Sequence, residues 1–587
     1  MALITQERPE AAAAAPPPAP PPVNRRTLQV PSWRAMLAAS IMGAFLVAGI
    51  WSVIDLRINL ATMLDSWQNA VTFMGRALPL EFPPAAELIE GTLLTLAIVV
   101  FATVLAVVMS IPVALLAAHN TSRSAPVRAG ARAFIVVMRA MPELILAIFF
   151  IRVFGWGMGA VAGVLALALH SIGMLGRMYA DAIEDYDDGP RRSLEAAGAS
   201  RAQQVLGATL PGVLPAIIAH GLHRFDINLR ASIILGWVGV QGLGNDLSAA
   251  LSVGNYTTAL ALALVVLVLC ILVELLSGHL RMKLMGRAGP SRFGILWALR
   301  ALRSRYATST ASHQATGPYL PAGAQYGSAT TPPWDRERIA RFSYLGLTAA
   351  IIIASVYYSN FNIVAFFTGL VELPAVADNF FPPSDGGIAE TIFDQMLVTL
   401  QIALAATLIG ALLALPVGVL AARNVAPNHT VVQIFRTIIV VTRGIPELIL
   451  AILLIVIMGM GAVAGTLALA VGAMGLLSKL VADSIEETDV LVQDAVTAAG
   501  ATPRQVFVAA TVRQAAPAVI AHIFYQLDVN FRSATLLGIV GAGGIGFQLE
   551  MARRTLDFEV ITYILVLVIN VVLVIEAFSV LMRGLVR

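Results

Sequence analysis

The sequence RAMPELILAI, from Arg139 to Ile148, returns in the second half of the chain as RGIPELILAI at residues 443–452. Two further segments repeat in the same order: GAVAG at 159–163 returns at 461–465, and DINLR at 226–230 returns as DVNFR at 528–532. The repeat predicts two similar halves that enclose one pathway. An even number of membrane spans in each half would make the halves parallel, related by an axis along the membrane normal.

The composition is typical of a membrane protein. Of the 587 residues, 58% are hydrophobic and 12% are charged, whereas soluble domains carry about 25% charged residues. Apolar runs of about 20 residues can cross a hydrocarbon layer of about 30 Å. We therefore expect an all-α integral membrane protein with about twelve transmembrane helices in two parallel six-helix repeats. The spans are expected near residues 35–55, 91–118, 131–154, 157–180, 209–236 and 257–277, and near 342–360, 395–421, 431–457, 460–482, 511–540 and 560–582.

The chain divides into four expected parts: a disordered cytoplasmic tail (1–34), a first repeat (35–280), a cytoplasmic linker (281–340) and a second repeat (341–587). The tail contains AAAAAPPPAPPP and has too few apolar residues to form a core. Arg and Lys residues of alternate loops gather on one side, which the positive-inside rule places in the cytoplasm. The protein is therefore expected in the plasma membrane, multi-pass, with both termini cytoplasmic.

Two polar stretches interrupt the apolar pattern at matching places. They are RRSLEAAGASRAQQVLGATLP at 191–211 and VQDAVTAAGATPRQVFVAATVR at 492–513. Each suggests a short helix, with a tight turn that Gly198 or Gly500 allows. A membrane protein that places such a helix twice in its loops is expected to present it to a separate motor protein. The plainer alternative is an ordinary amphipathic loop helix.

These stretches resemble the EAA loop of type I binding-protein-dependent ABC importers, in which Glu-Ala-Ala precedes a Gly and a closing Leu-Pro. Aligned on Gly198, the first copy keeps Leu-Pro but has Arg192 at the acid position, with Glu195 out of register. Aligned on Gly500, the second copy keeps an acid, Asp494, but loses Leu-Pro. The resemblance implies coupling loops at 187–208 and 489–510. The ATPase-coupling candidates are Arg192, Glu195, Gly198, Ala199, Arg201, Asp494, Ala495, Gly500, Ala501 and Arg504.

A narrower resemblance, to the phosphonate permease subfamily, covers most of 91–280 and 395–582. It is carried by RAMPELILAIFF, GVLALALHSIGMLGRMYADAIED, their repeats, and the Gly-rich LGIVGAGGIG at 537–546. It implies the transmembrane domain of a type I ABC importer, with two permease copies fused in one chain. The implied partners are two copies of a cytoplasmic ABC ATPase that carries ATP-Mg, an extracytoplasmic phosphonate- or phosphate-binding protein, and membrane lipids. No cofactor, metal site or nucleic-acid partner is expected in this chain, and the choice among phosphonate, phosphate and phosphite stays open.

Ionisable residues inside the expected spans are costly and are candidates for function. Most have an opposite charge four residues away, which suggests a pair on one helix face. Two interpretations are open: the pairs are neutralised structural locks, or their cations attract an anion that passes between the halves. The lock is preferred. The candidates are Arg139, Glu143, Arg177, Asp226, Arg230, Arg443, Glu447, Lys479, Asp528 and Arg532, while Glu274 and Glu576 are expected to face protein or to snorkel.

The Gly-rich turns at 236–244 and 538–546 are candidates for a gate near the outer face. Non-helical backbone at membrane depth is tolerated only where protein or water covers it. The gate candidates are Gly239, Gly242, Gly244, Gly541, Gly543, Gly544 and Gly546.

The sequence favours an ATP-driven importer subunit that performs no chemistry itself. Neither Lys283 nor Lys479 follows a Gly, so a Walker A loop that would hold ATP is not found. The alternative is a proton-coupled secondary transporter with six-plus-six helices, which would need an unpaired intramembrane acid. A membrane enzyme is disfavoured because no catalytic or metal-binding constellation is visible.

Overall fold

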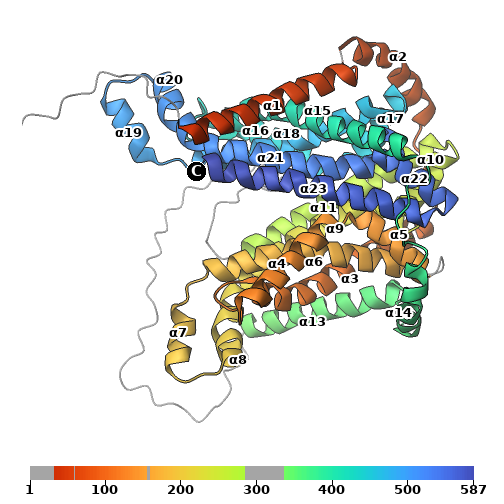
Figure 1. The fold of residues 1–587 in the computed structure, drawn as a ribbon, viewed down its shortest axis with the longest axis horizontal. Helices are drawn as coiled ribbons and strands as arrows, with labels where there is room; N and C mark the ends of the chain where they lie inside the picture. The colour runs from red at the N-terminus through yellow and green to blue at the C-terminus, as the bar shows by residue number, and fades with distance from the viewer. Residues whose placement is uncertain (1–31, 59, 155–158, 285–335, 362, 587) are drawn as a thin grey trace, which may run out of the picture.

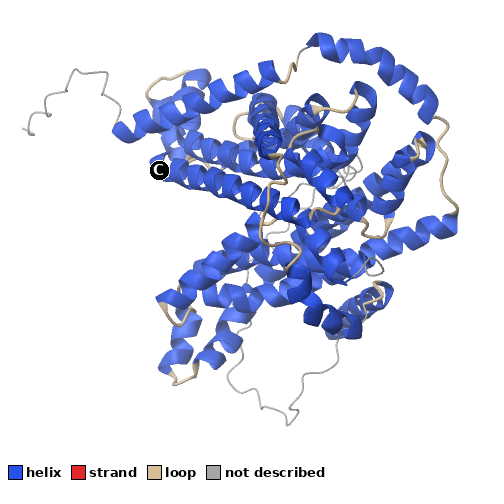
Figure 2. Ribbon diagram, turned by 45° about the vertical axis from the view of Figure 1, so that its right-hand side comes forward, coloured by secondary structure: helices blue, strands red, loops and turns tan. Residues whose placement is uncertain are grey.

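The computed structural model describes residues 32–58, 60–154, 159–284, 336–361 and 363–586, and all regular structure in these ranges is helical (Figure 2). Apart from a few residues at their edges, the expected tail and linker lie outside the described residues. Nine described helices are long and apolar enough to cross a membrane, and two bent helix pairs raise this number to eleven. The remaining expected span corresponds to the helix Arg336–Tyr358, whose apolar part is Gly346–Tyr358.

The two halves present their elements in the same order. The first half contains α1 (Trp33–Asp55), α2 (Leu60–Ala77), α3 (Ala85–Ala117), α4 (Ala125–Ala140), α5 (Glu143–Phe154), α6 (Gly159–Asp185), α7 (Gly189–Ala196), α8 (Arg201–Gln204), η2 (Val205–Thr209), α9 (Leu210–Leu235), η3 (Gly236–Val238), α10 (Leu243–Ser252) and α11 (Tyr256–Leu284). The second contains α13 (Arg336–Tyr358), α14 (Ile363–Ala377), α15 (Ala389–Ala421), α16 (His429–Gly444), α17 (Glu447–Met458), α18 (Ala462–Glu486), α19 (Val490–Ala498), α20 (Pro503–Val506), η4 (Phe507–Val512), α21 (Arg513–Leu537), η5 (Gly538–Ala542), α22 (Ile545–Thr555) and α23 (Phe558–Val586).

The core of each half forms where a long helix packs against a helix rich in small residues, α3 against α6 and α15 against α18. Small side chains are needed because the backbones approach closely. A Cβ on Gly410 would lie 2.6 Å from the Cβ of Ala473, and a Cβ on Gly418 would lie 2.7 Å from that of Val481. Such small-residue contacts let helices associate in a lipid environment, where burial of apolar surface contributes little to the free energy of association.

The first helices of each half pack against the other half. Helix α1 packs on α15 and α23, and α13 packs on α3. Phe45 of α1 meets Phe524 of α21 with ring centroids 5.7 Å apart, and Gln401 of α15 donates to the Asp55 carboxylate at 2.8 Å. The short helices α2 and α14 likewise contact α17 and α5 of the opposite half. The exchange ties the two halves together around their shared interface.

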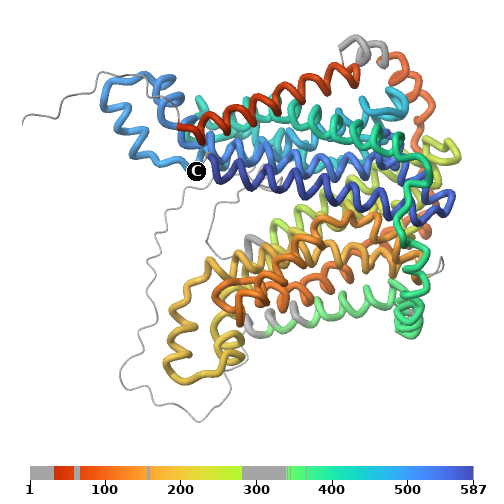
Figure 3. The backbone as a smooth tube through the Cα atoms, viewed as in Figure 1, coloured from red at the N-terminus to blue at the C-terminus, as the bar shows by residue number. Residues whose placement is uncertain are grey.

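Both polar hairpins lie at the same end of the helix bundle. Figures 1 and 3 show α7–α8 on one half and α19–α20 on the other, apart from one another, with α10 and α22 near the opposite end. This arrangement confirms that the repeats run in parallel. The C-terminal end of the chain lies at the hairpin end as well (Figure 1).

Candidate functional site

Two bent spans face the interface between the halves. The α4–α5 pair is bent by 89° and the α16–α17 pair by 80°. The bends occur at Pro142 and Pro446, which lack an N–H for the helix ladder and force the preceding residue into an extended conformation. The expectation that opposite charges four residues apart share one helix face is therefore wrong at these bends, because the two members of each pair lie on different helices. The affected pairs are Arg139 with Glu143, and Arg443 with Glu447.

Arg139 instead pairs with the last helix of the other half. Its Nη1 lies 3.0 Å from Oε1 of Glu576 on α23. Arg177 of α6 lies 3.7 Å from the same oxygen and 3.7 Å from Asp181, its predicted partner. Glu576 therefore contacts two cations of the first half. These contacts could not be predicted without the tertiary packing.

Glu143 lies beside a buried histidine. Its Oε2 is 3.7 Å from Nε2 of His170 on α6, and the His170 Nδ1 is 2.9 Å from the Met141 carbonyl at the bend. In the second half the residue equivalent to His170 is Gly472, and a Cβ there would lie only 2.6 Å from the Glu447 carboxylate. The carboxylates at the two bends therefore lie in different surroundings.

The second set of predicted pairs forms as expected. Arg230 is 3.1 Å from Asp226 on the same helix, and Arg532 pairs with Asp528 in the same way. Arg230 also reaches Glu274 of α11 at 3.5 Å. These contacts support the lock interpretation, because each cation already has an acid.

The same two arginines connect the halves. Arg230 Nη1 donates to the Arg443 carbonyl oxygen at 3.0 Å, and Arg532 Nη1 donates to the Arg139 carbonyl oxygen at 3.2 Å. Each accepting carbonyl lies in the last turn of a helix that ends at the bend, where backbone carbonyls lack intrahelical donors. Each half therefore caps the broken helix of the other, a reciprocal contact that follows the internal repeat.

Behind these contacts lies a buried polar chain that differs between the halves. In the first half, Arg224 Nε donates to Ser171 Oγ at 2.8 Å, Ser171 donates to Asn228 at 3.0 Å, and Asn228 donates to Thr103 at 3.0 Å. In the second half, Gln526, Asn530 and Thr407 form the corresponding chain with bonds of 2.9 and 2.8 Å. Arg224 was not among the residues predicted from the sequence, although its mismatch with Gln526 is visible when the two repeats are aligned.

The remaining predicted cation, Lys479 of α18, lies within electrostatic range of Asp483, four residues further on. The local pair of Lys479 with Asp483 stays a prediction.

The Gly-rich turns pack tightly inside their own halves. Positive φ angles at Gly239 and Gly541, 99° and 107°, allow the chain to reverse after α9 and α21. The N–H of Leu243 donates to Thr95 at 2.9 Å, and that of Ile545 to Thr399 at 2.7 Å. Of the other predicted gate glycines, Gly242, Gly543 and Gly544 lie in the same turns, and Gly244 and Gly546 lie in the first turn of α10 and of α22. Their role as gates stays a prediction.

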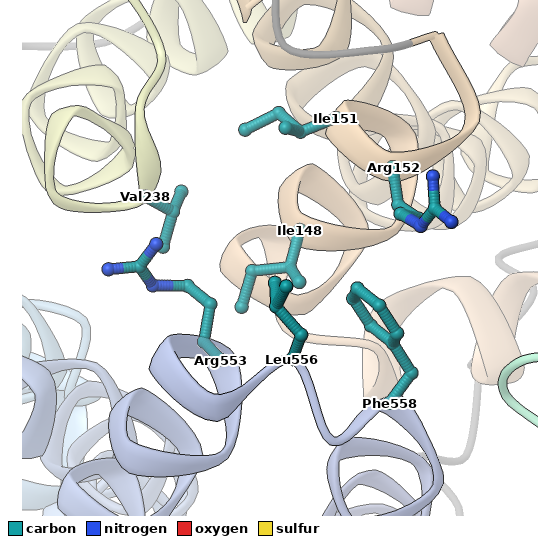
Figure 4. A pocket seen from close by; sticks show the side chains of 7 residues that line it. All are labelled: Ile148, Ile151, Arg152, Val238, Arg553, Leu556 and Phe558. Atoms are coloured by element: carbon teal, nitrogen blue, oxygen red, sulfur yellow. The ribbon is translucent and has the colours of Figure 1, made fainter.

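A small pocket lies between the halves near these turns (Figure 4). It has a volume of about 20 Å³ and is lined by Ile148, Ile151, Arg152, Val238, Arg553, Leu556 and Phe558. A volume of this size holds about one water molecule. The Arg152 guanidinium lies 5.6 Å from the Phe558 ring centroid, and Arg553 is paired with Glu550 at 2.7 Å. The pocket is too small to hold an organic substrate in this conformation.

The two hairpins share one geometry. Gly198 and Gly500 make the turn with φ angles of 81° and 87°. A capping box follows in each: Ser200 with Gln203, and Thr502 with Gln505. A π-helical turn then leads directly into α9 or α21, so each hairpin continues into a helix that crosses the bundle.

The exposed faces of the hairpins differ chemically. Helix α7 has Arg191 hydrogen-bonded to Asp188 at 3.0 Å, and the side chains of Arg192 and Glu195 are 74% and 60% exposed. Helix α19 begins with exposed apolar residues, among them Leu491 at 75%. Asp494, Ala495 and Arg504 are exposed, while Ala199 and Ala501 are half-buried and Arg201 is exposed. The first turn of α19 thus exposes Val490, Leu491 and Val492 at positions where the first hairpin has Asp188, Gly189 and Pro190.

The comparisons with known proteins agree with this architecture. The model of the family "Binding-protein-dependent transport system inner membrane component" matches residues 110–285 and 414–587. The chain is 37% identical to the "Phosphate-import permease protein PhnE" of Mycolicibacterium smegmatis over 88% of this chain and 89% of that protein. It is 37% identical to the "Phosphite transport system permease protein PtxC" of Stutzerimonas stutzeri over 42% of this chain and 89% of that protein.

Among solved structures, one titled "Inward facing conformations of the MetNI methionine ABC transporter: CY5 native crystal form" is 25% identical. It covers 33% of this chain and 96% of its own, with a TM-score of 0.30. The fusion follows from the two family matches and from the half-length relative. The chain belongs to the binding-protein-dependent transport system inner membrane component family and carries two copies of that permease unit in one polypeptide.

Proposed function

We propose that this permease imports phosphate, phosphonate or phosphite, driven by two copies of a separate cytoplasmic ATPase and supplied by an extracytoplasmic binding protein. Support for the substrate class comes from the relatives, whose names refer to phosphate and phosphite. The partner ATPase binds and hydrolyses ATP-Mg, and this chain moves the substrate across the membrane without catalysing a reaction.

The observation that carries the proposal is the pair of exposed hairpins at one end of the bundle, one in each half (Figure 1). An ATPase that moved the hairpins could transmit this movement to the membrane helices only if the hairpins were rigid. The positive-φ glycine turns, the capping boxes and the direct continuation into α9 and α21 provide that rigidity. With the hairpin end in the cytoplasm, both termini are cytoplasmic too, as the positive-inside rule favours.

Closure of the ATPase pair would draw the hairpins together and rock the two halves about their interface. Helices α9 and α21 carry Arg230 and Arg532, so the movement reaches the carbonyls of Arg443 and Arg139 that these side chains hold. Breaking and re-forming two reciprocal bonds gives a switch with discrete states, which is what alternating access needs.

Reconstitution tests the proposal. Proteoliposomes that contain this chain, the ATPase, ATP and the binding protein are expected to accumulate phosphate, phosphonate or phosphite. Omission of ATPase or ATP is expected to abolish uptake. Uptake that continues without ATPase but follows a proton gradient would instead support a proton-coupled carrier.

The coupling role has its own test in Gly198→Val combined with Gly500→Val. Neither glycine has a heavy atom within 4 Å of an added Cβ, so the strain comes from the positive φ alone. We expect ATP hydrolysis that no longer drives uptake. Gly254→Val, with a φ of 73° and equally open surroundings away from the hairpins, is the matched control and should leave coupling intact. Normal coupling in the double variant would contradict the role of the hairpins.

A further inference from the structure

The small pocket between the halves has one arginine from each half in its wall. Arg152 lies in the last turn of α5 in the first half, and Arg553 lies in the last turn of α22 in the second half. Both side chains line the pocket, and in the view of Figure 4 they lie on different sides of it, with Ile148 and Leu556 between them. The two guanidinium groups are the only charged groups among the described side chains that line the pocket.

The cations at this pocket outnumber the acids that bind them. Arg152 lies over the Phe558 ring, 5.6 Å from its centroid, and no acid among the described residues is in ion-pair contact with it. Arg553 binds Glu550 at 2.7 Å, and Arg554 binds the same carboxylate at 2.7 Å. One carboxylate therefore serves two guanidinium groups, while the third has an aromatic ring as its partner.

Two further acids follow in the sequence, but neither holds the arginines of the pocket. Asp557 accepts from Thr555 Oγ1 at 2.6 Å, and Glu559 is exposed in the first turn of α23. In the described part of the chain, neither acid forms an ion pair with Arg152 or Arg553. Arg553 donates to its own acid through Nε and Nη2, which leaves Nη1 without a hydrogen bond to any described residue. Both arginines therefore retain N–H donors that an anion could use.

The scaffold does not require a cation at either position. The residue equivalent to Arg152 is Val456 of α17, and the residue equivalent to Arg553 is Leu251 of α10. Helices α17 and α10 end at the same places without a basic residue in the last turn. A favourable interaction with the helix dipole is therefore dispensable at these helix ends, and the two charges call for another explanation.

We propose that Arg152 and Arg553 form the site that receives the transported oxyanion at the outer mouth of the pathway. This inference rests on the proposed function. The pocket adjoins α22, which lies at the end of the bundle opposite the hairpins, the side on which the binding protein would release its ligand (Figure 1). A planar guanidinium matches the geometry of phosphate oxygens, and one guanidinium from each half would hold the anion from two sides.

The site depends on the conformation because its two cations belong to different halves. In this structure the pocket has a volume of about 20 Å³, enough for about one water molecule, so the mouth is closed. Separation of the halves at this end would move Ile148 and Ile151 away from Leu556 and open the space between the arginines. An anion that binds only this open state favours it, and the anion is released when the halves close again.

The test exchanges the arginines for the residues of the other copy. Arg152→Val and Arg553→Leu each place at the pocket a side chain that the equivalent position already carries. The matched control is Arg554→Ser, which follows the same rule with Ser252. It removes an equal charge and one partner of Glu550 from the same helix end, but the Arg554 side chain is 69% exposed and is not among the residues that line the pocket.

Binding is measured in the purified complex with its ATPase, held with a non-hydrolysable ATP analogue and without the binding protein. Radiolabelled inorganic phosphate is expected to bind about ten- to a hundredfold more weakly to each pocket variant than to the wild type, the range for loss of a charge-assisted hydrogen bond. Arg152→Lys keeps the charge and is expected to lie between the wild type and Arg152→Val. Arg554→Ser is expected to bind phosphate as the wild type does, because an exposed charge outside the pocket contributes little.

Transport provides a second readout and separates this inference from the proposed function. In proteoliposomes with the ATPase, ATP and the binding protein, phosphate uptake by each pocket variant is expected to be at least about tenfold slower than uptake by Arg554→Ser. Similar unfolding temperatures of the pocket variants and Arg554→Ser exclude a folding defect as the cause. If the wild type transports phosphate and the pocket variants bind and transport it as well as Arg554→Ser does, the site is refuted and the proposed function stands. If the wild type transports none of the three oxyanions, the proposed function fails and the site with it.

Discussion

Asp528→Asn should destabilise the protein more than the equivalent change in the first half. Asp528 is 8% exposed and Arg532 is 16% exposed, so the pair is largely removed from water. Among the described residues, Asp528 is the only acid in ion-pair contact with Arg532. Removing one member of a buried pair costs about 3–5 kcal/mol. We expect about 3 kcal/mol, because the Arg139 carbonyl still accepts from Arg532.

Asp226→Asn is the matched control. There Arg230 keeps Glu274 at 3.5 Å, so its charge remains compensated. The loss is then closer to one hydrogen bond, about 1 kcal/mol. The difference of about 2 kcal/mol corresponds to about thirtyfold in the unfolding equilibrium constant.

Both variants can be unfolded in mixed detergent micelles and followed by tryptophan fluorescence. Equal destabilisation of the two variants, or a larger effect of Asp226→Asn, would refute the argument that Glu274 shares the charge of Arg230.

Three further predictions concern the ends of the helices. Arg436→Met should lower the free energy of unfolding by about 3 kcal/mol, and Arg132→Met by less than about 1 kcal/mol. The two arginines occupy equivalent ion pairs, but their side chains are 10% and 54% exposed; thermal unfolding compares the two variants. Arg191 hydrogen-bonds to Asp188 and lowers the pKa of that carboxyl. The contact should therefore stabilise the first hairpin above about pH 4 and lose its effect as the pH falls through the lower folded pKa, which hydrogen exchange with and without Asp188→Asn would detect. Gly546→Ala should prevent correct folding, since its Cβ would lie 2.0 Å from the Thr535 carbonyl oxygen; the yield of folded protein in gel filtration measures this.

The hairpins and the parallel repeat could be predicted because both depend on local signals. Gly198 and Gly500 occupy equivalent turns, and a positive φ there follows from a short helix–turn–helix pattern. The prediction for Arg139 and Glu143 failed because spacing was applied across Pro142. The rule that a proline ends a helix at the preceding residue outweighs the rule that residues four apart share a face.

The contacts between the halves could not be predicted in the same way. Glu576 joins Arg139 and Arg177 only because α23 contacts α4 of the opposite half. The reciprocal arginine–carbonyl bonds likewise depend on where each bend lies relative to the other half. Such contacts join segments far apart in the sequence, and no periodicity within either segment encodes them.

The internal repeat carries a second kind of information, in the positions where the copies differ. His170 against Gly472, and Arg224 against Gln526, place an imidazole and a guanidinium at these positions in the first half only. The hairpins differ as well, since α19 begins with the exposed Val490, Leu491 and Val492 where the first hairpin has Asp188, Gly189 and Pro190. A fused pair allows such specialisation, because each copy is free to change without altering the other. The shared features, the bends and the reciprocal arginine bonds, are those that a symmetric rocking movement needs. The unequal features are the positions at which the two halves can contribute differently, so substitutions that exchange the residues of one copy for those of the other test whether the halves act alike.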